Sequence, residues 1–127
     1  MPSLRIFKTK TFARWAQDAG LGDAALKNAI DEMQNGLVDA SLGGKVYKKR
    51  VATGNKGKSG GVRTLIAYQD ENRAVFMFGF AKNERANIAQ AELKALKLTA
   101  RILLEKSDAT IKIDLKAKEL IEVKSND

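Results

Sequence analysis

The stretch VRTLIAYQDENRAVFMFGFA, residues 62–81, decides the fold. Val62 to Tyr68 contains mainly residues that favour β-strands, and Asp70-Glu71-Asn72 is typical of a turn. Ala74 to Ala81 is an almost unbroken apolar run, which is typical of a central strand covered on both faces. The stretch therefore predicts two neighbouring strands of one sheet.

The residues before this stretch predict a strand and two helices. Leu4 to Phe7 indicates an opening strand, and Thr9 or Thr11 can cap the helix after it, which stops at Gly20. Asp23 is the expected cap of the second helix. Because so little chain joins the two helices, we expect an antiparallel hairpin that covers one face of the sheet.

Lys45 to Ala52 predicts a further strand, and Thr53 to Gly61 predicts a glycine-rich loop. Within it, the segment ATGNKGKS, residues 52–59, nearly matches a phosphate-binding P-loop. A P-loop needs a helix directly after it, whereas Val62 begins a strand, so this context excludes binding of a nucleoside triphosphate. The lysines and backbone amides of the loop still suit contacts with backbone phosphates.

Helical periodicity after residue 81 predicts a long helix that begins near Asn83 or Glu84. Its apolar face is expected to pack on the sheet and consists of Leu93, Leu96, Ala100 and Leu103. Another face is polar and consists of Gln90, Lys94, Lys97, Arg101 and Glu105. Ser107-Asp108 resembles a helix cap, so we expect a short helix there and a terminal strand from Leu120 to Val123.

Composition favours one small domain of the α+β class. The chain has 127 residues, of which 44% are hydrophobic, so it is long enough for one compact core. It contains no cysteine and no histidine, which excludes disulfides and removes the ligands of most zinc and copper sites. We therefore expect no metal and no cofactor. No apolar run approaches about 18 residues and the N-terminus is not leader-like, so we expect no membrane segment and a cytoplasmic location.

Positive charge is concentrated in one part of the chain. The formal net charge is +8, from 23 basic and 15 acidic residues. The segment from Ala40 to Gln69 has no acidic residue and seven basic ones, which leaves 16 basic against 15 acidic residues elsewhere. The seven are Lys45, Lys48, Lys49, Arg50, Lys56, Lys58 and Arg63. This concentration favours a polyanionic partner; a solvated lysine-rich surface is the alternative.

Strand geometry divides these basic residues between two faces. In a strand, Lys48 and Arg50 point to one face and Lys49 points to the other. Tyr47 lies on the same strand, where it can stack on an unpaired base or pack in the core. Arg63 interrupts an apolar strand, and its planar guanidinium suits a phosphate.

Lys82-Asn83-Glu84-Arg85 follows the most apolar strand, and clustered polar groups at a strand end are typical of functional sites.

If the polyanionic partner is RNA, the basic residues could also take part in its cleavage. Cleavage of RNA needs cations near the phosphorus atom and proton transfer at the 2′- and 5′-oxygens. Without histidine, the available acid or base is Glu84, a lysine with a lowered pKa, or Tyr47. We therefore expect weak intrinsic activity that depends on a substrate complex such as the ribosome.

Two segments resemble the RelE/ParE toxin superfamily. They are GKSGGVRT, residues 57–64, and FGFAKNE, residues 78–84, which together resemble a RelE-like subfamily. The resemblance extends from Leu4 to Val123. It implies a RelE-like fold, in which an N-terminal strand and helix hairpin pack on a small, mostly antiparallel sheet with a C-terminal helical extension. We expect a single RelE-like toxin domain, residues 1–127, with 106–127 as the extension.

The resemblance also implies a function. Such toxins belong to type II toxin–antitoxin systems, cleave mRNA in the ribosomal A site without a metal, and are neutralised by a cognate antitoxin. The chain is thus expected to be an mRNA interferase, an endoribonuclease that inhibits translation. Several relatives use a histidine or a C-terminal tyrosine for proton transfer. This chain departs from that pattern, because residues 107–127 contain no aromatic residue.

By position, the resemblance assigns Lys48, Lys49 and Arg50 to a basic second-strand cluster, Arg63 to the arginine of the next strand, and Lys82 with Arg85 to a basic group after the last core strand. The catalytic candidates are therefore Arg63, Lys82, Glu84, Arg85 and Arg50. The candidates for RNA binding are Lys45, Tyr47, Lys48, Lys49, Lys56 and Lys58. Two alternatives stay open, a ParE-like toxin that poisons gyrase and a non-catalytic RNA-binding module. The concentrated charge favours RNA.

Overall fold

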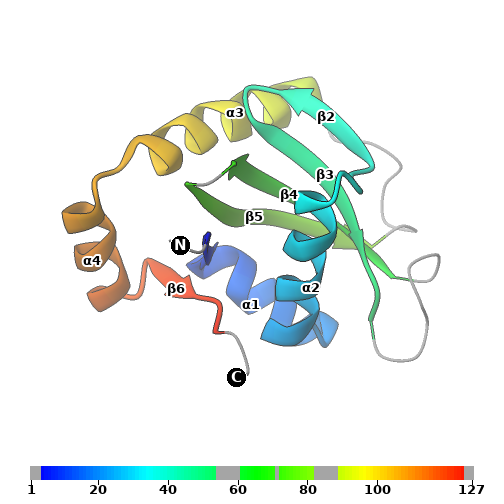
Figure 1. Cartoon of the computed structure of the whole chain (residues 1–127), viewed down its shortest axis with the longest axis horizontal. Coiled ribbons are helices and arrows are strands. Elements are labelled where there is room, and N and C mark those ends of the chain that lie inside the picture. Colours follow the sequence, from blue (N-terminus) through cyan, green and yellow to red (C-terminus); the bar gives the residue numbers. More distant parts are fainter. Residues whose placement is uncertain (1–3, 54–60, 71, 82–88, 125–127) are drawn as a thin grey trace.

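The computed structural model describes residues 4–53, 61–70, 72–81 and 89–124. The elements follow one another as the sequence predicts, with one additional strand (Figure 1). They are β1 (Arg5–Thr9), α1 (Lys10–Ala19), α2 (Asp23–Gln34), β2 (Ala40–Gly43), β3 (Val46–Val51), β4 (Val62–Gln69), β5 (Arg73–Ala81), α3 (Gln90–Glu105), α4 (Asp108–Lys116) and β6 (Leu120–Glu122).

The strands form one six-stranded sheet in the order β2-β3-β4-β5-β1-β6. Neighbouring strands are antiparallel, except that β1 and β5 are parallel. The mostly antiparallel α+β fold expected from the sequence is thereby confirmed. The sequence did not predict β2, because its residues ASLG lack the β-branched and aromatic side chains that mark strands; pairing with β3 holds it in the sheet.

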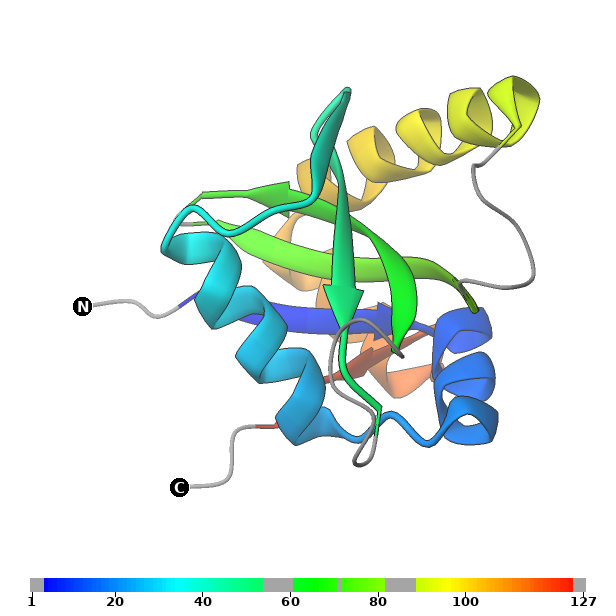
Figure 2. The same ribbon diagram turned by 90° about the vertical axis from the view of Figure 1, so that its right-hand side faces the viewer.

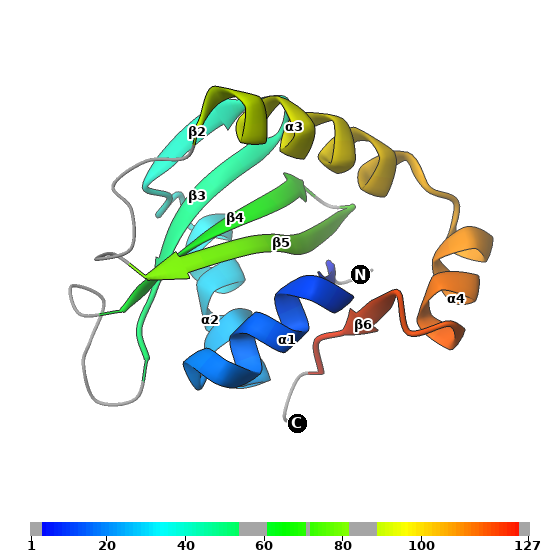
Figure 3. The ribbon, with the colours of Figure 1, turned by 180° about the vertical axis from the view of Figure 1, so that it is seen from behind.

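Helices cover both faces of the sheet. α1 and α2 lie on one face, and α3 lies on the other (Figures 1 and 3). α1 packs on β5 and α2 on β3, and Figure 2 shows the two helices diverging from their short connection. The expected helix pair thus covers one face, but its members pack on different strands rather than mainly along each other.

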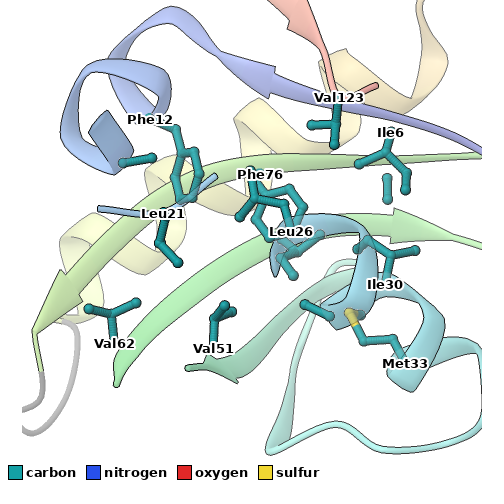
Figure 4. Packing of buried hydrophobic residues seen from close by; sticks show 14 residues of the cluster. Ile6, Phe12, Leu21, Leu26, Ile30, Met33, Val51, Val62, Phe76 and Val123 are labelled. Atoms are coloured by element: carbon teal, nitrogen blue, oxygen red, sulfur yellow. The ribbon is translucent and has the colours of Figure 1, made fainter. Parts of the chain in front are cut away.

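The larger core lies between the α1–α2 pair and the sheet. Figure 4 shows Phe12 of α1 and Leu26 of α2 directed toward Phe76 of β5. The second core lies under α3, where Val75 and Met77 of β5 are buried. β5 is therefore covered on both faces, as its apolar run predicts.

A close contact with α1 requires glycine at one position of β5. A Cβ at Gly79 would lie 2.1 Å from Cζ3 of Trp15, so only glycine leaves room for the indole there. Trp15 in turn packs on Phe12, with ring centroids 5.4 Å apart. This packing explains the glycine of the sequence FGF near the end of the apolar strand.

Several predicted helix ends are confirmed and two are corrected. Thr9 caps α1 by accepting a hydrogen bond from the amide of Phe12 at 3.1 Å, and Gly20 ends the helix at φ 76°. Gly22, not Asp23, holds the cap position of α2. α3 begins at Gln90 rather than near Asn83 or Glu84.

Asp23 instead ties α2 to β1 and to the C-terminal segment. Its carboxylate accepts hydrogen bonds from Nζ of Lys8 at 2.8 Å and from the amide of Lys124 at 3.1 Å. Burial alone would raise the pKa of Asp23, but these two hydrogen bonds outweigh it and the pKa is lowered. The ion pair with Lys8 is therefore present at neutral pH.

The C-terminal part forms a short helix and a strand, as expected. Ser107 caps α4 by accepting a hydrogen bond from the amide of Thr110 at 3.2 Å. β6 pairs with β1, and Arg5 binds both carboxylate oxygens of Glu122, at 3.0 and 3.1 Å. No helix in the part of the chain that the structure describes is long and apolar enough to cross a membrane.

Candidate nucleic-acid interface

Strands β3 and β4 place basic residues on the side of the sheet that faces α3. Arg50 of β3 stands opposite Arg63 of β4, and Lys48 stands opposite Leu65. Residues directly opposite each other in an antiparallel pair point to the same face, and Leu65 belongs to the core under α3. We call the surface that carries Lys48, Arg50 and Arg63 the cationic face.

Arg63 presents a buried and unsatisfied donor on this face. Its Nη1 is buried and has no hydrogen-bond partner among the described residues. A buried donor without a partner costs free energy, and so do two like charges directly opposite each other in a sheet. A phosphate bound between Arg63 and Arg50 would relieve the repulsion between them, because each planar guanidinium can donate two hydrogen bonds to it. Nη1 of Arg63 is itself buried, so it can donate to the phosphate only after the Arg63 side chain turns.

Arg50 is held in place by a carboxylate that sequence reasoning did not single out. Its Nε donates to Oδ2 of Asp39 at 3.0 Å, with the two side chains 45% and 19% exposed. An ion pair this exposed adds little stability, so its main effect is to orient the guanidinium. No signal in the sequence pairs Asp39 with Arg50, because the pairing depends on β2.

Two phenylalanines share the cationic face. Phe80 stands opposite Arg63 and Phe78 opposite Leu65, with ring centroids 6.1 Å apart. Phe78 is only partly buried, so its ring can contribute a stacking surface for an unpaired base. The sequence predicts Phe78 as part of the core, and its ring does pack against the core under α3, while part of it stays exposed.

Lys49 lies on the opposite face, as alternation along the strand predicts. Its side chain is 3% exposed, and Nζ is 2.7 Å from Oε1 of Glu32 on α2. The buried hydroxyl of Thr64 donates to the carbonyl of Lys49 at 2.9 Å. The structure therefore does not bring Lys49 to the cationic face, and its ion pair instead fixes α2 on β3.

Tyr47 also points away from the cationic face. It packs against the α1–α2 core and meets Tyr68 edge to face, with ring centroids 5.8 Å apart. Burial and the carboxylate of Asp70, to which the Tyr68 hydroxyl donates at 3.1 Å, raise the pKa of Tyr68 to about 12. Packing in the core, the alternative to base stacking for Tyr47, is what the structure shows.

Of the remaining candidates, Lys45 lies at the start of β3 and the others lie outside the described residues. Lys45 precedes β3 and lines a hollow with Lys97 and Arg101 of α3. Lys56, Lys58, Lys82, Glu84 and Arg85 lie outside the described residues. Val51, Val62 and Ala81, at the ends of β3, β4 and β5, are neighbours in the sheet beside Arg50 and Arg63.

The described residues contain no group of three or more His, Cys, Asp and Glu that could hold a metal ion. They do contain a cationic face on which Nη1 of Arg63 has no partner among them, with the ring of Phe78 nearby. The fold and this face define a small basic α+β protein suited to binding a polyanion.

Comparison with known families identifies the chain more closely. Residues 4–123 match the family described as the RelE toxin of the RelE / RelB toxin-antitoxin system. The chain belongs to the RelE toxin family, and it is a toxin of a toxin–antitoxin system with an antitoxin as its partner. No curated protein matches the chain.

Proposed function

We propose that this toxin is a metal-independent mRNA endonuclease that acts on mRNA held in the ribosomal A site and so inhibits translation in the cytoplasm. The observation that supports the proposal most directly is the buried Nη1 of Arg63, which has no partner in the described part of the chain, opposite Arg50 on the cationic face. Membership of the RelE toxin family supports the same activity.

The reaction requires little of the protein beyond charge and position. The 2′-oxygen of one nucleotide attacks the adjacent phosphorus, the bond to the 5′-oxygen breaks, and the products are a cyclic phosphate and a 5′-hydroxyl. Extra negative charge develops on the phosphoryl oxygens between these events. Arg63 and Arg50 would stabilise that charge, a contribution that typically accounts for factors of about 100 to 1000 in rate.

Proton transfer is the part that the described residues supply least. The proton of the 2′-hydroxyl must go to a base, and the 5′-oxygen must receive one. The sequence offers Glu84 for these steps, with Lys82 and Arg85 as further cations, directly after Ala81 of β5. Tyr47 is not part of the proposed site, because it faces the other core. Weak proton transfer explains why the toxin would need the ribosome to position its substrate.

The proposal is tested by inducing the toxin in cells and mapping mRNA 5′ ends by primer extension. Wild type should arrest growth and produce new ends within translated codons, whereas Arg63→Ala should do neither while still binding the antitoxin. Arg14→Ala, which removes an exposed arginine of α1, is the matched control and should behave as wild type. Arrest without new ends, or arrest with a DNA-damage response, would contradict the proposal and favour RNA binding alone or gyrase poisoning.

A further inference from the structure

Helix α3 packs on the sheet more closely through its C-terminal half than through its N-terminal half. Ala100, Leu103 and Leu104, toward its C-terminal end, are buried, whereas Leu93 and Leu96 are only partly buried. The N-terminal half borders a hollow of about 440 Å³, whose lining includes Lys94 and Lys97. Because apolar contacts do not fill this side of the helix, its basic side chains are open to a ligand.

A second hollow continues along the same flank of the helix. It measures about 230 Å³, lies between α3 and the start of β3, and is lined in part by Lys45, Lys97 and Arg101. Lys97 lines both hollows. Lys94, Lys97 and Arg101 follow one another at helical spacing on one flank and span about 10 Å at 1.5 Å per residue. We call these three residues the α3 strip.

The turn between β2 and β3 is shaped to hold Lys45 beside the α3 strip. Gly43, Gly44 and Lys45 have φ values of 87°, 60° and 65°, and a positive φ is uncommon for a lysine. A Cβ at Gly44 would lie 3.1 Å from Cγ of Lys97, so the lysine stem lies directly on the turn. Positive φ at Gly44 and Lys45 is what a two-residue hairpin turn between paired Gly43 and Val46 requires, so the hairpin itself sets the position of Lys45.

The α3 strip also differs from the basic residues that stabilise the fold. Lys8, Lys49 and Lys106 each contact a carboxylate. Lys45, Lys94 and Lys97 form no ion pair within residues 4–53, 61–70, 72–81 and 89–124. Nε of Arg101 is 3.6 Å from Oε2 of Glu105, but the two side chains are 73% and 69% exposed. This ion pair therefore compensates little of the local positive charge.

We propose that the α3 strip, together with Lys45, binds the phosphates of a second stretch of the same RNA strand, several nucleotides from Arg63. Lys45 and Arg50 are five residues apart at opposite ends of β3, which corresponds to about 17 Å in a strand. Lys48 lies between them on the cationic face. The site rests on the proposed function in one respect, namely that RNA is the polyanion that the toxin binds.

The test measures binding of the intact toxin to a labelled single-stranded RNA of 12 nucleotides with 2′-O-methyl groups, which cannot be cleaved. The variant carries Lys94→Gln, Lys97→Gln and Arg101→Gln. The matched control carries Arg14→Gln, Lys112→Gln and Lys116→Gln, which removes the same charge from exposed positions of α1 and α4. Thermal unfolding of both variants verifies that they are folded.

The expected result is specific to the α3 strip. Its variant should bind about tenfold more weakly, and the slope of log K against log salt should become less steep by about 2, because each phosphate contact to a single strand contributes about 0.7. The control should bind as wild type. Equal binding by the two variants would overturn the proposal. So would an α3-strip variant that binds RNA normally but escapes the antitoxin, because the strip would then be an antitoxin surface.

This experiment separates the second site from the proposed function. The oligonucleotide cannot be cut, so binding by the α3 strip is measured whether or not the toxin cleaves mRNA. The Arg63→Ala experiment reports on cleavage whether or not the α3 strip binds RNA. Failure of one proposal is thereby distinguishable from failure of the other.

Discussion

Adjacent cations on β3 have different structural roles, and the difference lies in the face each occupies. Lys49 is buried, and its charge is matched by Glu32 at 2.7 Å. Arg50, the next residue, is 45% exposed, pairs with Asp39 through Nε only, and stands opposite Arg63, whose Nη1 has no partner among the described residues. A buried charge must be paired to be tolerated, whereas a charge kept for a ligand must be left available. The α2 side of β3 is therefore structural, and the α3 side is the candidate RNA surface.

The largest expected effect comes from removing the buried ion pair between Lys49 and Glu32 on the α2 side of β3. Lys49→Met removes the buried ammonium group that contacts the carboxylate of Glu32. Because this breaks a buried ion pair, the free energy of unfolding should fall by about 3 kcal/mol. Lys48→Met, one residue away on the cationic face, should change it by less than about 0.5 kcal/mol. Urea denaturation of both variants measures the difference. Equal destabilisation would show that the two faces do not differ as described.

The α1 contact on the structural side gives the next largest effect. Gly79→Ala places a Cβ 2.1 Å from Cζ3 of Trp15 and should destabilise the fold by about 2 kcal/mol, because the indole and α1 must move. Trp15→Leu in the same chain should recover part of that loss. Thermal unfolding of the two single variants and the double variant measures the coupling. Strictly additive losses would mean that the clash is not the cause.

The smallest effect concerns the ion pair between Arg5 of β1 and Glu122 of β6, which lies at the edge of the sheet, away from both faces of β3. The hydrogen bond from Arg5 lowers the pKa of Glu122 below its ordinary value of 4.5. The pair therefore stabilises the fold above about pH 4.5, and this contribution is lost as the pH falls through the lowered pKa. Because the pair is partly exposed, the change should stay below about 1 kcal/mol. Unfolding of wild type and Glu122→Gln at pH 7 and pH 3 should converge at the lower pH; a constant difference would contradict this.

The sequence predicts the fold well where a periodic pattern is matched by burial. The apolar run 74–81, the caps Thr9 and Ser107 and the terminal strand were all predicted from local chemistry, and the structure confirms them. β2 was missed because ASLG has no strand signal of its own and is held only by its pairing with β3. The start of α3 was predicted too early in the chain, because helical periodicity does not identify the first residue of a helix.

The candidate site was less predictable than the fold. Alternation along β3 assigned Lys48 and Lys49 to opposite faces, but it could not tell which face was covered by α2 or that Glu32 would meet Lys49. The hydrogen bond between Arg50 and Asp39 depends on β2, the strand that the sequence did not predict. The α3 strip was visible only as one polar face of a helix, since its nearness to Lys45 arises from tertiary packing.

The most direct test is single-turnover cleavage of mRNA on programmed ribosomes by purified Arg63→Gln toxin. If Arg63 stabilises the charge on the scissile phosphate, the rate constant at saturating toxin should fall by about 100- to 1000-fold, while thermal unfolding and antitoxin binding stay as in wild type. A rate constant within about twofold of wild type would contradict the assignment of the α3 side of β3 and β4 as the reactive surface.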